Sequence, residues 1–263
     1  MSIESQTLGD FCVRVWTGGA AATPPLLYLH GHEQHPGDAA FLHRLAEGRR
    51  VFAPEHPGYG ASTGFETVEG VLDVVLFYRE LVGSWGIAAI DVVGHSLGGM
   101  FAAELAAIAP QVVRRLVLVD AYGLWLDDPP VPDVFGLTDA ELRAAKWHDP
   151  EAAPDPEPTI FEPDPSDPLA AVMFRAGNLA VAGKFLWPIP DRGLRRRLGL
   201  VKARTLVVHG ESDGLVPMVY AEEFTRLIPG ARLARVGGAG HLPMFEREDE
   251  FCTMVDSFLS EEG

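Results

Sequence analysis

Along most of the chain, short runs of apolar residues alternate with longer segments in which apolar residues recur every three or four positions. The short runs favour strands, and the longer segments favour amphipathic helices. We expect strands at residues 11–16, 25–30, 50–54, 90–93, 115–119, 205–209 and 232–236. We expect helices at residues 38–47, 68–82, 99–109, 217–228 and 247–259. Because strands and helices alternate, the pattern predicts parallel βαβ units with helices on both faces of one sheet.

Two of the predicted helices illustrate the pattern. In residues 38–47 the helical period points four apolar residues inward: Ala39, Leu42, Leu45 and Ala46. Asp38 is expected to be the N-cap, because its carboxylate can accept a hydrogen bond from the first helical turn. In residues 68–82 apolar residues occur at positions 68, 71, 72, 75, 76 and 82, which again gives one apolar face.

Residues 122–200 break this alternation. They are rich in proline and aspartate, and the segment is too long for a plain loop. It also carries more aromatic residues than a disordered linker would need. These are Trp125, Phe135, Trp147, Phe161, Phe174, Phe185 and Trp187. We therefore predict a helical cap over the site with a partly extended, proline-rich portion. The alternative is a flexible insert unrelated to substrate.

Composition narrows the class of protein. The chain has 263 residues, 47% of them apolar, and a formal net charge of −16. An acidic surface repels nucleic acids and anionic membranes, so we expect neither as a partner. The apolar stretches are shorter than the ~20 residues of a membrane-spanning helix. The N-terminus lacks the order of a signal peptide, and Cys12 and Cys252 have no metal-type spacing. These features predict a cytoplasmic protein with two free thiols.

Candidate chemistry begins at residues 94–98, Gly-His-Ser-Leu-Gly, which lie between a predicted strand and a predicted helix. Gly-X-Ser-X-Gly in this context is the sequence form of a nucleophile elbow. Gly94 and Gly98 would keep side chains out of the space beside Ser96. The Ser96 hydroxyl would then stand at the N-terminus of the following helix, where negative charge is favoured. That placement suits a serine that attacks a carbonyl carbon.

A serine nucleophile needs a base to take its proton and a carboxylate to orient that base. Asp213 and His241 each follow a predicted strand, on turns that would lie at the same edge of the sheet as Ser96. Glu211 and Asp120 are alternative acids. The other histidines at strand ends are expected to be structural or to line the pocket; they are His30, His95 and His209.

The oxyanion of a tetrahedral intermediate needs two aimed N–H donors. We expect one from the backbone of Leu97, directly after the serine. For the second we expect the backbone N–H of His32, with Glu33 as the alternative, because Gly31 lets this loop approach closely. The side chains of Glu33 and His35 are expected to be solvated rather than to reach the pocket.

The chain resembles the α/β-hydrolase fold family. The matching motifs occur in family order: LHGH at 29–32, PGYGAS at 57–62, GHSLGG at 94–99, GESDGLVP at 210–217 and GAGHLP at 238–243. The resemblance implies an eight-stranded, mostly parallel sheet flanked by helices, with a mainly helical cap inserted after strand 6. Residues 1–121 and 201–263 would form the core and residues 122–200 the cap. The resemblance also implies Ser96, Asp213 and His241 as the catalytic triad.

Together these features predict a serine hydrolase that acts through an acyl-enzyme. The leading substrate is a partly apolar carboxylic ester, and no metal or organic cofactor is implied. Hydrolysis of a C–C bond, a lactone or a thioester is an alternative on the same triad, and a carbonyl-addition lyase is a further rival. A non-catalytic small-molecule receptor is the alternative from another class. A substrate carboxylate, if present, would find arginines in the cap: Arg192, Arg195, Arg196 and Arg197. A solvated face is the other interpretation of these arginines.

Overall fold

The computed structural model describes residues 1–20, 24–155, 157–160 and 167–261. Its centre is an eight-stranded sheet with the order β1-β2-β4-β3-β5-β6-β7-β8. The β1/β2 and β2/β4 pairs are antiparallel, and the other five pairs are parallel. The strands are β1 (Ser2–Leu8), β2 (Phe11–Gly18), β3 (Leu26–Leu29), β4 (Val51–Pro54), β5 (Ile90–His95), β6 (Val113–Val119), β7 (Arg204–Gly210) and β8 (Arg232–Val236). The expected α/β-hydrolase sheet is confirmed.

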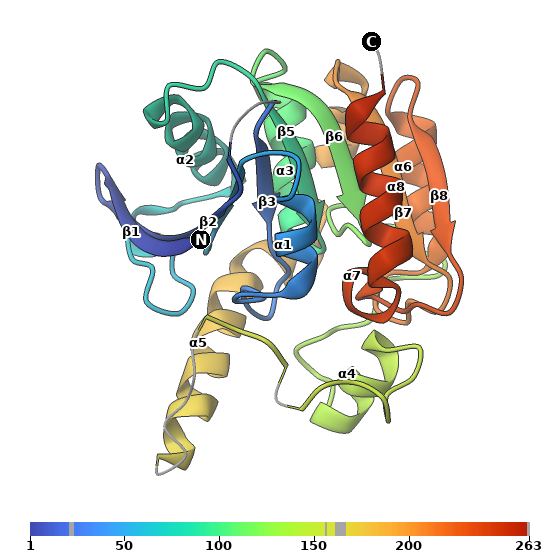
Figure 1. The fold of residues 1–263 in the computed structure, drawn as a ribbon. Coiled ribbons are helices and arrows are strands. Elements are labelled where there is room, and N and C mark those ends of the chain that lie inside the picture. The colour runs from blue at the N-terminus through green and yellow to red at the C-terminus, as the bar shows by residue number, and fades with distance from the viewer. Residues whose placement is uncertain (21–23, 156, 161–166, 262–263) are drawn as a thin grey trace.

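Helices cover both faces of this sheet (Figure 1). One face carries α2 (Val71–Ser84), α3 (Leu97–Ile108) and α6 (Met218–Leu227). The other carries α1 (Ala40–Leu45) and α8 (Glu248–Ser260), which follows the short α7 (Pro243–Glu246). A 3₁₀ turn at Phe65–Thr67 precedes α2.

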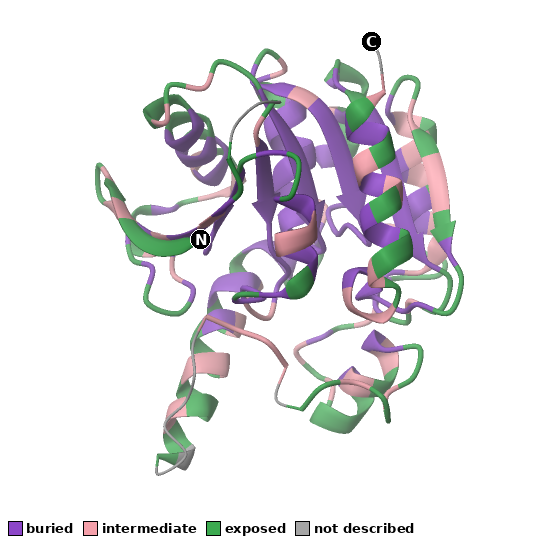
Figure 2. Cartoon of the chain, viewed as in Figure 1, coloured by how far each residue is buried: buried purple, intermediate pink, exposed green. Residues whose placement is uncertain are grey.

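Side-chain alternation along the strands creates a separate core on each face. In β3, Leu27 and Leu29 pack with the α2/α3/α6 side, whereas Leu26 and Tyr28 pack with α1 and α8. Successive strand residues point to opposite faces, so a strand buried on both sides is apolar throughout. Figure 2 shows the result, with the central strands and the inward helix faces buried. The rigid sheet sets the positions of the loops at its carboxyl edge.

The cap contains α4 (Asp139–Lys146), α5 (Pro168–Leu186) and 3₁₀ turns at Leu194–Arg196 and Leu198–Leu200. Both helices lie beyond the end of the sheet toward which the parallel strands point (Figure 1). We use "the cap" for residues 122–200. The expected cap helices after strand 6 are therefore present. Phe161 and part of the proline-rich stretch lie outside the described residues.

Helix α5 differs from expectation in its hydropathy. Its segment Leu169–Leu186 is long and apolar enough to cross a membrane by length and composition alone, with a mean hydropathy of 1.3. The expectation that the chain holds no such stretch is therefore wrong for this segment. Its C-terminal part is buried against the core at Phe185 and Leu186, whereas Leu169 and Met173, nearer its N-terminus, are 62% exposed.

The start of α1 also differs from the prediction. Ala39, not Asp38, is the N-cap residue, and it makes no side-chain capping bond. Asp38 Oδ1 accepts a hydrogen bond from the Trp16 indole at 2.7 Å and pairs with His43 Nε2 at 2.7 Å. Asp38 therefore binds Trp16 and His43 instead of capping the helix. The four residues predicted to face inward are all buried.

Two other local features were not predicted. Leu72 and Leu76 of α2 are 50% and 38% exposed, because the helix turns a face that includes Phe77 and Leu81 onto the sheet. Strand β1 has an exposed, mostly polar sequence and forms only because it pairs along its whole length with β2. Both features depend on packing between segments, which the hydrophobic period of a single segment does not predict.

Candidate active site

Ser96 lies at a sharp turn between β5 and α3. Its φ of 56° is in the left-handed region, where a non-glycine residue is strained. A Cβ on Gly94 would lie 2.4 Å from the carbonyl oxygen of Gly98, and one on Gly98 would lie 2.3 Å from that of Leu29. Both positions therefore require glycine. The geometry is that of a nucleophile elbow, as the motif predicts.

The structure brings Ser96, His241 and Asp213 into one hydrogen-bonded line. Ser96 Oγ lies 2.9 Å from His241 Nε2, and His241 Nδ1 lies 2.8 Å from Asp213 Oδ2. Asp213 stands on the loop after β7, and His241 on the loop after β8. Ser96 is 0% exposed and His241 is 1% exposed. In this order a base can take the serine proton while the carboxylate orients the base.

Backbone donors and His241 stabilise the carboxylate of Asp213. Its Oδ1 accepts hydrogen bonds from the N–H groups of Leu215 at 2.8 Å and Val216 at 3.0 Å. Burial alone would raise the pKa of Asp213, but the charge and hydrogen bond of His241 outweigh it, and the pKa lies below its ordinary value. Asp213 is therefore ionised and able to orient the imidazole.

The alternative acids occupy different positions. Asp120 is buried at the end of β6, where its Oδ1 accepts from the Gly210 N–H at 2.9 Å and lies 3.3 Å from His209 Nδ1. Burial and the nearby charge of Asp213 raise the pKa of Asp120 well above its usual range. Glu211 is exposed. Of these three candidate acids, Asp213 is the one that is bonded to His241.

The N–H groups that we expect to form the oxyanion hole belong to Leu97, directly after Ser96, and to His32. Leu97 is the first residue of α3, so its N–H has no helical partner. No acceptor among the described residues takes the N–H of His32. A Cβ on Gly31 would lie 2.8 Å from His95 Nδ1, so glycine lets this loop pack against the elbow. His95 in turn donates from Nε2 to the carbonyl of His241 at 2.8 Å.

Sequence reasoning missed two side chains beside the serine. The imidazole of His32 also contacts the nucleophile, with Nδ1 3.2 Å from Ser96 Oγ. Tyr122 packs its ring against His32 and His241, with centroids 5.7 and 5.9 Å apart, and its N–H donates to the Ser96 carbonyl. Tyr122 comes three residues after β6, so its place at a strand end was the available signal.

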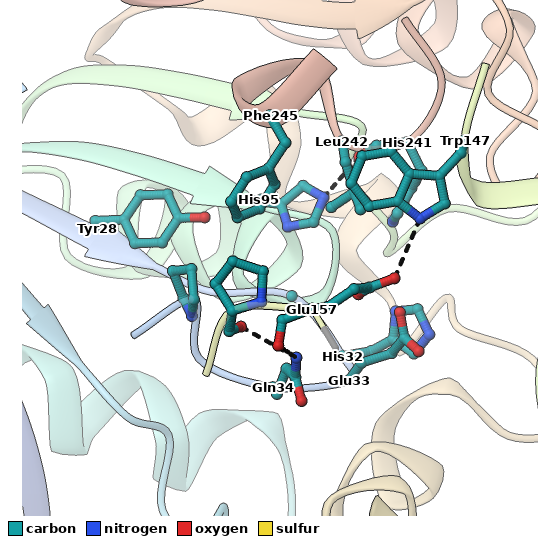
Figure 3. A pocket seen from close by; sticks show the side chains of 13 residues that line it. Tyr28, His32, Glu33, Gln34, His95, Trp147, Glu157, His241, Leu242 and Phe245 are labelled. Atoms are coloured by element: carbon teal, nitrogen blue, oxygen red, sulfur yellow. Dashed lines mark hydrogen bonds between the residues drawn. The ribbon is translucent and has the colours of Figure 1, made fainter. Parts of the chain in front are cut away.

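A cavity of about 40 Å³ adjoins His241, His95 and His32 (Figure 3). Glu33 and Glu157 line it, and both pair with the buried Lys146, at 2.5 and 2.6 Å. Burial alone would lower the pKa of Lys146, but the two carboxylates outweigh it and raise the pKa. The expectation that Glu33 is merely solvated is therefore wrong. Glu33, Lys146 and Glu157 all line a second, larger cavity of about 530 Å³ under the cap.

The end of α4 docks on both loops that carry Asp213 and His241. The carbonyl of Ala145 accepts from the Gly214 N–H at 2.9 Å, and that of Lys146 accepts from the His241 N–H at 2.7 Å. The last carbonyls of a helix have no helical partner, so these contacts satisfy groups that would otherwise need water. The cap is thus hydrogen-bonded directly to the candidate site.

Three further histidines and three of the four cap arginines have structural partners. His30 and His209 are buried and bonded to backbone groups, and His35 Nε2 donates to the Ala53 carbonyl rather than standing in solvent. Arg197 forms a bidentate pair with buried Glu104, Arg195 pairs with Glu223, and Arg192 donates to backbone carbonyls. Arg196 is exposed. None of the four lines the cavity at His241.

Comparison with known proteins shows the family of the chain. The model of the alpha/beta hydrolase family matches residues 26–253. A 2-hydroxymuconate semialdehyde hydrolase from Pseudomonas putida is 29% identical over 90% of this chain and 87% of its own. A pimeloyl-[acyl-carrier protein] methyl ester esterase from Aromatoleum aromaticum is also 29% identical, over 90% of this chain and 98% of its own.

Among solved structures, a meta-cleavage product hydrolase superposes with a TM-score of 0.78 at 23% identity and covers 98% of each chain. That similarity concerns the fold. The family model covers most of the sequence, and the relatives with these names are hydrolases. The chain belongs to the alpha/beta hydrolase family.

Proposed function

We propose that the protein is a serine hydrolase that cleaves a carboxylic ester through an acyl-enzyme, with Ser96, His241 and Asp213 as its catalytic residues. The observation that carries the proposal is the line of two hydrogen bonds, 2.9 and 2.8 Å long, from Ser96 through His241 to Asp213. This is the arrangement that turns a weak hydroxyl nucleophile into a reactive one.

The reaction has two steps. Ser96 attacks the ester carbonyl while His241 Nε2 accepts its proton, and the N–H groups of His32 and Leu97 hydrogen-bond the oxyanion. His241 then protonates the departing alcohol, which leaves a serine ester. Water, deprotonated by the same imidazole, attacks that ester and releases the carboxylic acid and the free serine. Asp213 orients the imidazole and stabilises its charged form in both steps.

The charge of the pocket favours an uncharged ester. Glu33 and Glu157 line the cavity beside His241, and the adjacent Lys146 is already paired with both. Two carboxylates and one ammonium leave a net negative charge, which repels an anionic substrate in a buried site. The relative named for an ester, the pimeloyl methyl ester esterase, is consistent with this reaction class.

Hydrolysis of a C–C bond is the second candidate. The relative from Pseudomonas putida is a 2-hydroxymuconate semialdehyde hydrolase, and it matches this chain over almost its full length. Such a substrate carries a carboxylate, for which the described lining of the cavity at His241 offers no unpaired lysine or arginine. The ester is therefore the better fit to the pocket.

Turnover of p-nitrophenyl butyrate tests the proposal. The wild-type protein should hydrolyse it, and Ser96→Ala should lower kcat by at least about 10³-fold while the protein stays folded. Unchanged turnover by Ser96→Ala would contradict the assignment. Faster turnover of 2-hydroxymuconate semialdehyde than of any ester would favour the second candidate, and labelling of Ser96 by a fluorophosphonate without turnover of either would favour a receptor.

A further inference from the structure

The imidazole of His30 bonds to backbone groups through both of its nitrogens, beside the loop expected to supply an oxyanion donor. The residue is 0% exposed. Its Nε2 lies 2.9 Å from the backbone nitrogen of His56, and its Nδ1 lies 2.8 Å from the carbonyl oxygen of Gly31. The mechanism proposed above needs the N–H of the next residue, His32, to be aimed at the oxyanion.

These partners determine which nitrogen of His30 carries the hydrogen. A backbone N–H can only donate, so His30 Nε2 accepts from His56 and carries no hydrogen. A backbone carbonyl can only accept, so Nδ1 carries the hydrogen and donates it to Gly31. Burial, with the nearby His56 and His35, lowers the pKa of His30 well below its ordinary value, so the ring holds a single hydrogen. His30 is therefore a neutral imidazole with a fixed Nδ1–H donor.

The neighbouring His56 holds this residue in place. Its Nε2 donates to the carbonyl of His30 at 2.9 Å. Burial lowers the pKa of His56 to about 3, so its Nδ1 carries no hydrogen and accepts from the Tyr78 hydroxyl. The His30 carbonyl also accepts from the Gly98 N–H at 2.9 Å, two residues after Ser96. The His30 ring, stacked on the His56 ring at 3.6 Å between centroids, is thus fixed relative to the elbow.

The hydrogen bond from His30 sets the direction of the His32 N–H. The Gly31 carbonyl and the His32 N–H belong to one trans peptide bond, so they point in opposite directions. The N–H therefore points away from the His30 ring. Two contacts place this peptide beside the nucleophile: His32 Nδ1 lies 3.2 Å from Ser96 Oγ, and a Cβ on Gly31 would lie 3.4 Å from Ser96 Cβ.

The glycine makes such a constraint necessary. Position 31 requires glycine, because a Cβ there would lie 2.8 Å from His95 Nδ1. Glycine also leaves the backbone free to rotate, so the peptide between Gly31 and His32 could turn over. A peptide turned over would present its carbonyl oxygen, which carries partial negative charge, to the oxyanion. The hydrogen bond from His30 opposes that rotation.

We propose that His30 is a positioning residue: its Nδ1–H holds the Gly31–His32 peptide in the orientation that aims the His32 N–H at the oxyanion. This inference rests on the proposed serine hydrolysis and deepens it, because it assigns a role in that reaction to a residue outside the triad. In this role His30 acts through the peptide and touches neither the substrate nor the reacting atoms.

Two substitutions of His30 separate its nitrogens. In His30→Asn the amide nitrogen can take the place of Nδ1 and donate to Gly31, but nothing replaces Nε2. In His30→Gln the amide oxygen can take the place of Nε2 and accept from His56, but the Gly31 carbonyl loses its donor. We expect His30→Gln to lower kcat for p-nitrophenyl butyrate by about 10- to 100-fold with KM unchanged, because a misplaced oxyanion donor weakens the transition state. His30→Asn should stay within about 5-fold of the wild-type kcat.

A thionoester separates this role from a general loss of structure. In p-nitrophenyl thionobutyrate a sulfur replaces the carbonyl oxygen, and sulfur accepts hydrogen bonds only weakly. The wild-type protein should therefore have a higher kcat/KM for the oxygen ester than for the thionoester. That ratio should fall by about 10-fold or more in His30→Gln and stay at the wild-type value in His30→Asn. Partial unfolding would lower both rates together and leave the ratio unchanged.

His35 provides the matched control. It is also buried and also bridges two backbone groups, with Nε2 3.0 Å from the Ala53 carbonyl and Nδ1 3.0 Å from the Gly37 nitrogen. Its ring packs against the His30 ring, with centroids 5.4 Å apart, so it also controls for packing. His35→Gln should keep the wild-type ratio of the two esters. A fall as large as in His30→Gln would contradict the proposal.

The outcomes distinguish this inference from the proposed function. If Ser96→Ala is inactive but His30→Gln keeps the wild-type kcat and ratio, His30 is not a positioning residue and the proposed function stands. The same holds if the wild-type protein hydrolyses both esters at equal kcat/KM, or if His30→Asn loses the ratio. If neither ester is hydrolysed, or if Ser96→Ala hydrolyses them normally, the proposed function fails and the role of His30 loses its basis.

Fluorophosphonate labelling of Ser96 verifies that each variant retains its elbow. If His30→Gln yields no labelled protein, His30→Asn decides, because it keeps the donor to Gly31. A wild-type ratio in His30→Asn then supports the proposal, and a ratio lowered by about 10-fold overturns it.

Discussion

At the scale of single residues, two buried aspartates beside the candidate base differ in protonation. Burial alone would raise the pKa of Asp213, but the charge and hydrogen bond of His241 outweigh it and hold the pKa below its ordinary value. Two backbone N–H groups also donate to this carboxylate. Asp120 is buried beside His209 with one backbone donor, and burial and the nearby charge of Asp213 raise its pKa well above the ordinary value. Environment, rather than residue type, therefore separates the two carboxyl groups.

This difference predicts opposite outcomes for two matched substitutions. Asp213→Asn should lower kcat for p-nitrophenyl butyrate by about 10⁴-fold, because an amide cannot stabilise the imidazolium and favours the wrong tautomer. Asp120→Asn replaces a neutral acid by a neutral amide of the same shape, so kcat should fall less than about 10-fold. Steady-state rates of the two purified variants are the measurement. An equal loss of kcat in both variants would contradict the different protonation of the two carboxyl groups.

At the scale of elements, α4 joins the cap to the candidate site. Its last carbonyls accept from the loops of Asp213 and His241, and the side chain of Lys146 pairs with Glu33 in the core and Glu157 in the cap. Lys146 is only 5% exposed, so these pairs are poorly screened by water. The position of α4 and the geometry of the site therefore depend on each other.

Lys146→Met should destabilise the folded protein by about 3 kcal/mol, because two partly buried carboxylates lose the buried counter-ion that they share. Urea denaturation measures the change. The control is Arg235→Met, which breaks a surface pair with Glu222 at 2.7 Å and should cause a much smaller change, since exposed pairs contribute little. Adding Glu33→Gln and Glu157→Gln to Lys146→Met should recover part of the loss. Equal effects of Lys146→Met and Arg235→Met would contradict the role of the buried lysine.

How far the sequence predicts this molecule depends on the range of the interactions involved. Ser96, Asp213 and His241 were located because each follows a strand in a short motif, and the sheet topology brings strand ends together. Lys146 and Tyr122 were not found, because their contacts depend on how the cap and the β6 loop pack. Packing of that kind has no local periodicity. Asp38 failed as a cap for the same reason, because Trp16 and His43 bind it instead.

At the scale of the whole molecule, buried histidines link stability to pH. Six of the nine histidines are buried and have pKa values lowered mainly by burial: His30, His32, His35, His56, His95 and His209. The lowered values are about 4 for His32 and about 3 for His35 and His56. In the unfolded chain these groups would bind protons below about pH 6.5.

Between the lowered native pKa values and about pH 6.5, the unfolded state therefore binds more protons than the native state. The free energy of unfolding must fall as the pH falls below about 6.5. Each such histidine contributes a slope of up to about 1.4 kcal/mol per pH unit. Urea denaturation at pH 7, 6 and 5 should show the decrease. His35→Gln should reduce the slope by about one histidine's share. A constant free energy of unfolding from pH 7 to pH 5 would contradict the lowered pKa values of the buried histidines.

The central claim is that Ser96 is acylated during turnover. The most direct measurement mixes the protein with p-nitrophenyl butyrate, quenches the reaction with acid and identifies modified peptides by mass spectrometry. We predict a butyryl group on the peptide that contains Ser96, and its absence from the Ser96→Ala protein, which should also have lost turnover. Turnover without an acyl group on Ser96, or with the acyl group on another residue, would contradict it.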